Sequence, residues 1–178
     1  MAPPLELTSV PPWAVTPLRP PADLTGRQWT VLAIGEHATA IAADWAAQIA
    51  AHRPDANPRV HLVDDIEAAR RALHDDLADA VVGWRLLLAG PAHACLRVRA
   101  DALEAGAADD EITVASTEVA TREIYCAHCR TVTLARIELT GTLPCLGCGH
   151  ELFVYYHVSR RLGTHLGFAS GANYRGTS

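Results

Sequence analysis

The amino-acid sequence predicts an α/β domain with a small parallel sheet, followed by a β-rich unit that holds four cysteines. Between residues 27 and 117, short apolar runs alternate with stretches in which apolar residues recur every third or fourth position. This alternation is typical of β-α-β units. After Thr117 the helical period disappears, and two Cys-x₂-Cys pairs separate further strand-like segments. The fold is therefore expected to change near residue 117.

Three β-α-β steps are expected in the first unit. The predicted strands are residues 28–34, 59–63, 84–89 and 111–115. Ile41, Trp45 and Ile49 repeat every fourth residue, as on the buried face of an amphipathic helix. Asp64 and Asp65 stand where the next helix begins, and acidic groups are favoured there. Because such crossovers join parallel strands, we expect a parallel sheet with helices on its faces.

The two ends of the chain differ from the folded units in composition. Residues 1–26 are rich in proline, which fixes φ and removes a hydrogen-bond donor. They predict an extended arm that is either pinned to a surface through Trp13 and Leu18 or disordered. Four glycines indicate that the chain loosens toward its other end (Gly163, Gly167, Gly171 and Gly176). The predicted organisation is an arm (1–26), an α/β domain (27–117), a ribbon (118–168) and a flexible tail (169–178).

Four cysteines carry the strongest functional signal. Cys126, Cys129, Cys145 and Cys148 form two Cys-x₂-Cys pairs, a spacing typical of four-cysteine zinc sites. The region is too small to fold on apolar surface alone, so a bound ion would supply much of its stability. We predict a β-rich Cys₄ zinc ribbon. Iron in the same four sulfurs is the alternative, and the expected cytoplasmic location disfavours disulfides.

Other residues capable of chemistry are given structural interpretations. His128 and His150 are expected to support the cysteines or to face solvent, and Cys95 to be a small buried apolar side chain. His157 and His165 either line a partner surface or are placed there by chance. The aspartate pairs are interpreted as helix caps and solvated turns (64–65, 75–76 and 109–110). The arginines of the ribbon are expected to balance the thiolates or to face a protein partner (Arg122, Arg130, Arg136, Arg160 and Arg161).

Composition excludes several functions. All the basic residues are arginine, which excludes lysine Schiff-base chemistry and a P-loop. The chain also has no nucleophile elbow and no His-Glu-x-x-His motif. Acidic groups outnumber arginines in residues 1–117, which argues against a nucleic-acid-binding protein. No apolar run is long enough to cross a bilayer and no secretory signal is present, so we expect a soluble cytoplasmic protein without a membrane partner.

The order of features in the first unit resembles the nicotinamide-binding domain of the ferredoxin reductase family. In that family the first strand ends in Gly-Gly-x-Gly-x-Thr-Pro, and Gly35 and Thr39 match this loop. The family motif Cys-Gly-Pro corresponds here to Ala-Gly90-Pro91. The resemblance implies a Rossmann-like, ferredoxin-reductase-like fold. It also implies that Gly35, Thr39, Gly90 and Pro91 are what remains of a cofactor site.

Ile34, His37 and Ala40 depart from the loop pattern, the cysteine of Cys-Gly-Pro is missing, and these departures affect cofactor binding. Ile34 and His37 place β-carbons where glycine would let the backbone approach a pyrophosphate, and Glu36 would repel it. A reductase-like domain that has lost its cofactor is therefore expected. Weak dinucleotide binding is the alternative.

Most of residues 27–168, without the proline-rich arm, resemble the small subunit of bacterial dimethylamine monooxygenase. The motifs that carry this resemblance are residues 145–150, 152–155 and 159–168, which follow the reductase-like domain. The resemblance implies a multi-subunit oxidoreductase that demethylates dimethylamine with NADPH and O₂, yielding methylamine and formaldehyde. In that family a reductase subunit carries flavin and [2Fe–2S], and an oxygenase subunit carries haem.

Neither the [2Fe–2S] cluster nor the haem can be placed on this chain. It has no cysteine pattern beyond a single four-cysteine set, and it has no haem-attachment motif. The chain is therefore expected to be an accessory subunit without catalytic residues. Its expected partners are the haem-bearing oxygenase subunit and the flavin/iron–sulfur reductase subunit. The zinc site is expected to help the chain to assemble or orient these partners. One alternative is a rubredoxin-like Cys₄ iron electron carrier in the same complex. The other is a stand-alone zinc-ribbon interaction protein.

Overall fold

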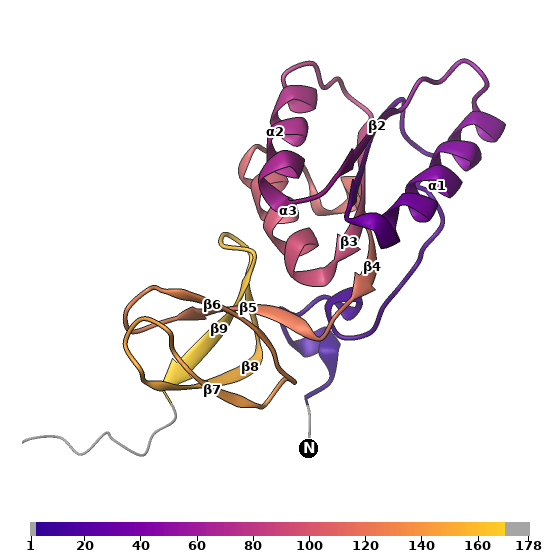
Figure 1. Ribbon diagram of the computed structural model, residues 1–178. Coiled ribbons are helices and arrows are strands. Elements are labelled where there is room, and N and C mark those ends of the chain that lie inside the picture. The colour runs from indigo at the N-terminus through magenta and orange to yellow at the C-terminus, as the bar shows by residue number, and fades with distance from the viewer. Residues whose placement is uncertain (1–2, 170–178) are drawn as a thin grey trace, which may run out of the picture.

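The computed structural model describes residues 3–169 and contains two sheets. The first has four strands in the order β2-β1-β3-β4, and the second has five in the order β6-β5-β9-β8-β7 (Figure 1). The predicted fold class, a parallel α/β sheet followed by a β-rich unit with a cysteine cluster, is confirmed. Within the described residues, no helix has the length and apolar character needed to span a bilayer.

The first sheet is entirely parallel. Its strands are β1 (Gln28–Ile34), β2 (Arg59–Val63), β3 (Trp84–Pro91) and β4 (Ile112–Glu118). The helices between them are α1 (Thr39–His52), α2 (Ile66–Leu77) and α3 (Ala92–Glu104). Helix α1 covers one face of the sheet, and α2 and α3 cover the other (Figure 1). The strand order reverses direction between β1 and β3, which is where α/β sheets open a crevice at their carboxyl edge.

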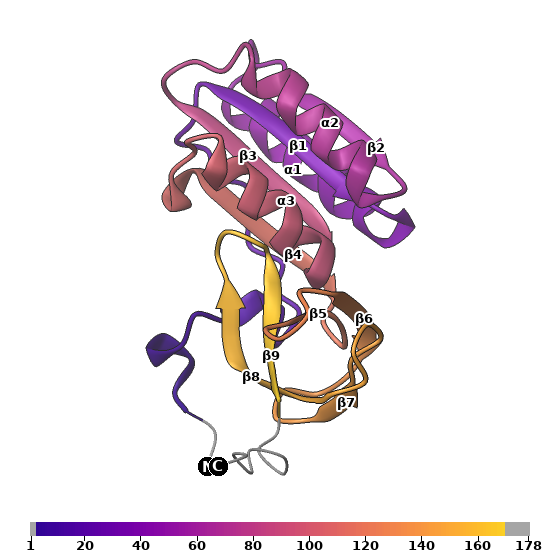
Figure 2. The ribbon, with the colours of Figure 1, turned by 90° about the vertical axis from the view of Figure 1, so that its left-hand side faces the viewer.

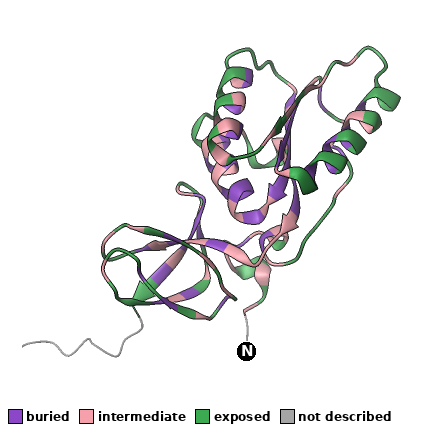
Figure 3. Cartoon of the chain, viewed as in Figure 1, coloured by how far each residue is buried: buried purple, intermediate pink, exposed green. Residues whose placement is uncertain are grey.

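The predicted helix faces are the buried ones. Ile41, Trp45 and Ile49 of α1 pack against β1 and β3 in one core cluster. Figure 3 shows the buried strands between helices whose outer surfaces are exposed. Asp65 caps α2, since its carboxylate accepts a hydrogen bond from the backbone N–H of Ala68 at 2.7 Å. The prediction of an acidic residue at this helix start is confirmed.

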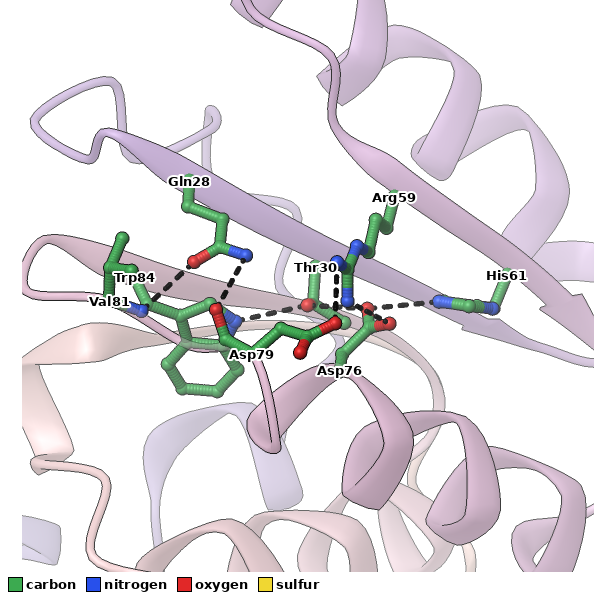
Figure 4. A network of polar contacts seen from close by, with 8 residues as sticks. All are labelled: Gln28, Thr30, Arg59, His61, Asp76, Asp79, Val81 and Trp84. Carbon is green, nitrogen blue, oxygen red and sulfur yellow. Dashed lines mark hydrogen bonds and ion pairs between the residues drawn. The ribbon is translucent and has the colours of Figure 1, made fainter.

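Asp76 was expected to lie in a solvated turn, and the structure corrects this: its residue is only 4% exposed. Its carboxylate accepts hydrogen bonds from Thr30 (2.7 Å) and Arg59 (3.1 Å) and lies 3.0 Å from Nε2 of His61 (Figure 4). The indole N–H of Trp84 donates to the same Thr30 hydroxyl at 3.0 Å. Burial by itself would raise the pKa of Asp76, but these donors outweigh it and lower the pKa below 3.8. The network ties the end of α2 to three strands.

We expect Asp76→Ala to lower the free energy of unfolding by about 2–4 kcal/mol, because it leaves three polar partners without their acceptor. Because the folded-state pKa of Asp76 is depressed, its contribution is present above the unfolded pKa, near 3.8, and is lost as the pH falls below that value. Urea unfolding at several pH values tests both points. The exposed neighbour Asp75→Ala is the control and should change stability by less than about 0.5 kcal/mol.

The second sheet follows directly on the first. Its strands are β5 (Thr121–Cys126), β6 (Val132–Arg136), β7 (Thr142–Pro144), β8 (Glu151–Ser159) and β9 (Thr164–Ala169). β9 lies between β5 and β8, parallel to β5 and antiparallel to β8. The indication that the chain loosens from Gly163 is therefore wrong, because residues 164–169 form an inner strand. The rest of the predicted tail, residues 170–178, lies outside the described residues.

The proline-rich segment is packed against both units. It forms two short 3₁₀ turns, Leu5–Leu7 and Pro12–Ala14, rather than a fully extended arm. Val10 and Ala14 are buried in a cluster with residues of α3 and β8. The backbone N–H of Val158 also donates to the Ser9 hydroxyl at 2.8 Å. Of the two sequence-based alternatives, the structure has the pinned segment. Trp13 packs against the core as predicted, whereas Leu18 is 42% exposed.

Arg122 and His165 are buried beneath this segment, and neither lies at the surface of the described residues. Arg122 donates from Nη1 to the carbonyl oxygen of Ala14 and from Nε to that of Ile137, each at 2.9 Å. Its Nη1 also lies 3.3 Å from Nε2 of His165, which is 1% exposed. Burial, and secondarily the nearby Arg122 charge, lower the pKa of His165 to about 3. The expectation that Arg122 balances the thiolates or faces a protein partner is therefore wrong, and of the two interpretations of His165 the partner surface is wrong, because both side chains lie in the core.

The turn between β8 and β9 packs against α3 and is one of the contacts between the two units, beside those of β5 and the N-terminal segment (Figure 2). Gly163 adopts φ +63° and lies so close to α3 that a β-carbon would stand 2.4 Å from the carbonyl oxygen of Leu96. Nη1 of Arg97 donates to the carbonyl oxygen of Leu162 at 3.0 Å. The close backbone contact explains why glycine occupies the end of this turn.

Candidate metal centre

The four predicted ligand cysteines come together at one end of the second sheet. Cys126 ends β5, Cys145 follows β7, and Cys129 and Cys148 lie in the turns after them. All four sulfurs lie within 4.8 Å of one another, with 3.8 Å between Cys126 and Cys148 and 3.5 Å between Cys129 and Cys145. A tetrahedral zinc with bonds of about 2.3 Å requires sulfurs about 3.8 Å apart. The cluster could therefore hold one metal ion.

The two turns share one backbone pattern, although one begins at Cys126 and the other at Cys145. In each, the N–H of the first cysteine donates to the carbonyl five residues later, at 2.9 Å to Thr131 and 2.8 Å to His150. In each, the N–H four residues later returns to the carbonyl of the first cysteine at 2.9 Å, from Arg130 and Gly149. Those two residues have positive φ, 67° and 72°. The turns are thus a matched pair of Cys₂ knuckles.

Gly147 lets the two knuckles approach each other. A β-carbon at this position would lie 2.2 Å from the Thr131 hydroxyl and 3.1 Å from Sγ of Cys129. The backbone N–H of Gly147 also donates to Sγ of Cys145 at 3.4 Å. Any side chain at position 147 would collide with Thr131 and crowd the sulfur of Cys129. Glycine is therefore required where the two knuckles meet.

The sulfurs have unequal affinities for protons. The hydroxyl and backbone of Thr131 lower the pKa of Cys129 to about 6. At Cys148 the backbone N–H of His150 favours the thiolate, but burial and the three neighbouring sulfurs outweigh it and raise the pKa to about 12. Four thiolates this close repel one another, so full ionisation requires a cation among them.

The surroundings of the cluster differ in part from the sequence-based expectation. His128 and His150 are exposed, and their rings lie 4.4 Å apart between centroids. Arg136 pairs with Glu118, and Arg160 pairs with Asp109. These two arginines therefore do not balance the thiolates, and sequence spacing alone could not assign their partners. Cys95 lies far along the chain in α3, fully buried as predicted, and burial raises the pKa of its thiol.

A second candidate site is a cavity of about 450 Å³ at the carboxyl edge of the first sheet. Of the four residues singled out for a cofactor, Gly35 and Pro91 line it, whereas Thr39 and Gly90 do not. Gly90 instead packs against Ile34. A β-carbon added at Gly90 would lie 3.0 Å from Cβ of Ile34. Glu123 of β5 closes the cavity from the second unit, a contribution that no sequence pattern indicated.

The cavity lining does not fit a dinucleotide. It carries four carboxylates (Asp64, Asp65, Glu67 and Glu123). Its one arginine, Arg97, donates a hydrogen bond to the carbonyl oxygen of Leu162, and its Nε lies 3.6 Å from a carboxylate oxygen of Glu123. Burial raises the pKa of Glu123, with a smaller opposing effect of Arg97. The excess of carboxylates disfavours a pyrophosphate at this edge, although the lining also includes the imidazole of His93, whose Nδ1 has no hydrogen-bond partner among the described residues.

Comparison with known proteins relates the C-terminal unit to a described family. Residues 123–168 match the family described as dimethylamine monooxygenase subunit DmmA-like, C-terminal domain. The chain is also 40% identical over 101 residues to the heme-dependent oxidative N-demethylase delta subunit of Ectopseudomonas mendocina (strain ymp). That alignment covers 57% of this chain and 57% of the relative, so the chain matches little more than half of the relative's length. No solved structure matches.

The matched region 123–168 contains both knuckles and the turn that packs against α3. These are the segments on which the sequence-based resemblance rested, and that resemblance is confirmed. The chain is similar to the small subunit of a dimethylamine monooxygenase-like complex, and its C-terminal unit matches the DmmA-like C-terminal domain.

Proposed function

We propose that this protein is an accessory subunit of an oxygenase complex that oxidatively N-demethylates dimethylamine with NADPH and O₂. Its similarity to a delta subunit of a heme-dependent N-demethylase supports a place in such a complex. In this proposal, haem lies on an oxygenase subunit, and flavin and [2Fe–2S] lie on a reductase subunit. This chain supplies no catalytic residue and positions these partners.

The matched knuckles carry the proposal. Sulfurs 3.5–3.8 Å apart across the two knuckles support one tetrahedral Zn²⁺ held by Cys126, Cys129, Cys145 and Cys148. Zinc has no second accessible oxidation state, so in this proposal the ion is structural. The acidic crevice supports the companion idea that the α/β domain is a scaffold that has lost its nucleotide.

One surface of the second sheet has the character of a docking site. On four neighbouring strands, β6, β5, β9 and β8, alternate residues place apolar side chains on the face opposite the core. We call this surface the outer ribbon face (Tyr125, Val132, Leu134, Phe153, Tyr155, Leu166 and Phe168). Leu134 is 56% exposed, and Tyr155 and Phe168 exceed 40%. The rings of Phe153 and Tyr155 stack at 5.9 Å between centroids. Exposed apolar patches of this kind mark protein–protein contacts.

Co-expression with the candidate oxygenase and reductase subunits, followed by affinity purification through this chain, tests the proposal. We expect a stable complex, and Leu134→Arg should reduce its yield at least about tenfold, because a charge would be buried in an apolar contact. Leu62→Arg, on edge strand β2, is the control with a similar exposure of 58%. Failure of the wild-type chain to co-purify would remove the accessory role. Loss of the complex with Leu62→Arg but not Leu134→Arg would assign docking to the other unit.

A rubredoxin-like electron carrier is the second candidate, and one observation favours it. Cys129 and Cys148 are only half-buried, so an iron held there would lie close to the surface for electron exchange. The two candidates use the same four sulfurs and differ in the ion. A visible absorption band that bleaches with dithionite would identify the carrier, whereas a colourless protein supports the structural role.

A further inference from the structure

His128 and His150 form a second group of ligands beside the Cys₄ cluster. Together with Cys148 they offer one ligand atom each, and the three atoms lie within 4.8 Å of one another. The histidines come from different knuckles, His128 from the first and His150 from just after the second. The group therefore forms only because the two knuckles are paired.

Both imidazoles are available for coordination. Each is exposed, and within residues 3–169 their one described contact is with each other, at 4.4 Å between ring centroids. Imidazole and thiolate are both ligands of Zn²⁺, and their combination is common in protein sites. Because both rings are already exposed, an ion can reach them from solvent without a rearrangement of the core.

The charge of the first site favours a second cation beside it. Four thiolates around one divalent ion leave a net negative charge, and Cys148 is the sulfur shared by both groups. A thiolate sulfur retains lone pairs after binding one ion and can bridge to another. Two imidazole ligands then complete the second coordination sphere without adding negative charge.

We propose that His128, His150 and the bridging sulfur of Cys148 bind a second Zn²⁺ at the surface, separate from the Cys₄ ion. Three protein ligands leave one position of the tetrahedron to water, so this ion exchanges readily, whereas the Cys₄ ion is closed off. The proposal shares Cys148 with the proposed zinc ribbon but can fail separately from it. A second ion would clamp the two knuckles together across their exposed side.

Equilibrium dialysis of the full chain against buffers of rising free Zn²⁺, with bound metal measured by mass spectrometry, tests the proposal. We expect about two ions per chain in two separable steps. His128→Ala with His150→Ala should keep the tighter step and lose the weaker one. The control is His52→Ala with His74→Ala, which removes two exposed imidazoles elsewhere and should keep both steps.

Each other outcome overturns the proposal. A wild-type chain that binds one ion has no second site and leaves the Cys₄ site intact. A weaker step that persists in the His128/His150 double variant assigns that ion to other residues. Loss of both steps in that variant means that the imidazoles serve the Cys₄ ion, and a wild-type chain that binds no zinc removes both sites.

Discussion

Cys145→Ser is expected to release the metal ion and to unfold the second unit, while the α/β domain stays folded. Cys145 is 3% exposed, and its sulfur lies 3.5 Å from that of Cys129. A serine hydroxyl is a poor zinc ligand, so only three ligands would remain. Binding of a structural zinc contributes about 10–16 kcal/mol in small zinc domains, far more than the small apolar core of the second sheet can replace.

Metal content and the ¹H–¹⁵N spectrum measure this outcome together. In the variant, bound zinc should fall to nearly none, and the dispersed signals of residues 118–169 should collapse. Signals of the first sheet should persist, because its two core clusters lie on either side of β1 and β3 and contain none of the four cysteines. Cys95→Ala is the matched control and should retain the metal, since Cys95 is buried in α3. A metal-free variant with an intact ribbon spectrum would contradict the structural role of the ion.

Gly163→Ala is expected to lower the free energy of unfolding by about 2–4 kcal/mol and to loosen the contact between the β8–β9 turn and α3. Two effects combine at this position. The backbone has φ +63°, which disfavours a side chain, and the added carbon would stand 2.4 Å from Leu96 O and 2.7 Å from Arg97 Cα. Because these contacts are with backbone, no side chain can move aside, and the turn must withdraw from α3.

Gly106→Ala separates the two effects. Gly106 also has positive φ, at 103°, but no atom lies within 4 Å of its added carbon. It should therefore lose only about 1 kcal/mol from backbone strain. Urea unfolding gives both free energies, and hydrogen exchange in α3 reports the contact with the turn. Equal losses in the two variants, with unchanged exchange in α3, would show that the contact between the turn and α3 adds nothing to stability.

Much of the first unit could be predicted because its signals are local. The fourfold spacing of Ile41, Trp45 and Ile49 depends only on helix geometry, and Asp65 caps α2 through a contact three residues away. Asp76 could not be assigned in this way. Its partners Thr30 and His61 lie on strands far away in the sequence, and its own pair of aspartates reads like a surface turn.

The second unit shows the same limit. The knuckles are local, so the cysteine spacing was enough to group the four ligands. β9 was missed because its glycines suggested a loose chain, whereas Gly167 allows close packing on Ile124 and Leu152. The interior position of Arg122 depends on the N-terminal segment, whose Ala14 carbonyl accepts its hydrogen bond. Long-range contacts of this kind leave no periodic pattern in the sequence.

Elemental analysis and the visible spectrum of the chain, purified without added metal and desalted, distinguish a structural zinc in the four-cysteine cluster from a redox iron. We expect about one tightly held zinc per chain and no visible absorption band before or after dithionite. Stoichiometric iron with a band that bleaches on reduction would contradict this expectation, because the four sulfurs would then hold a redox centre.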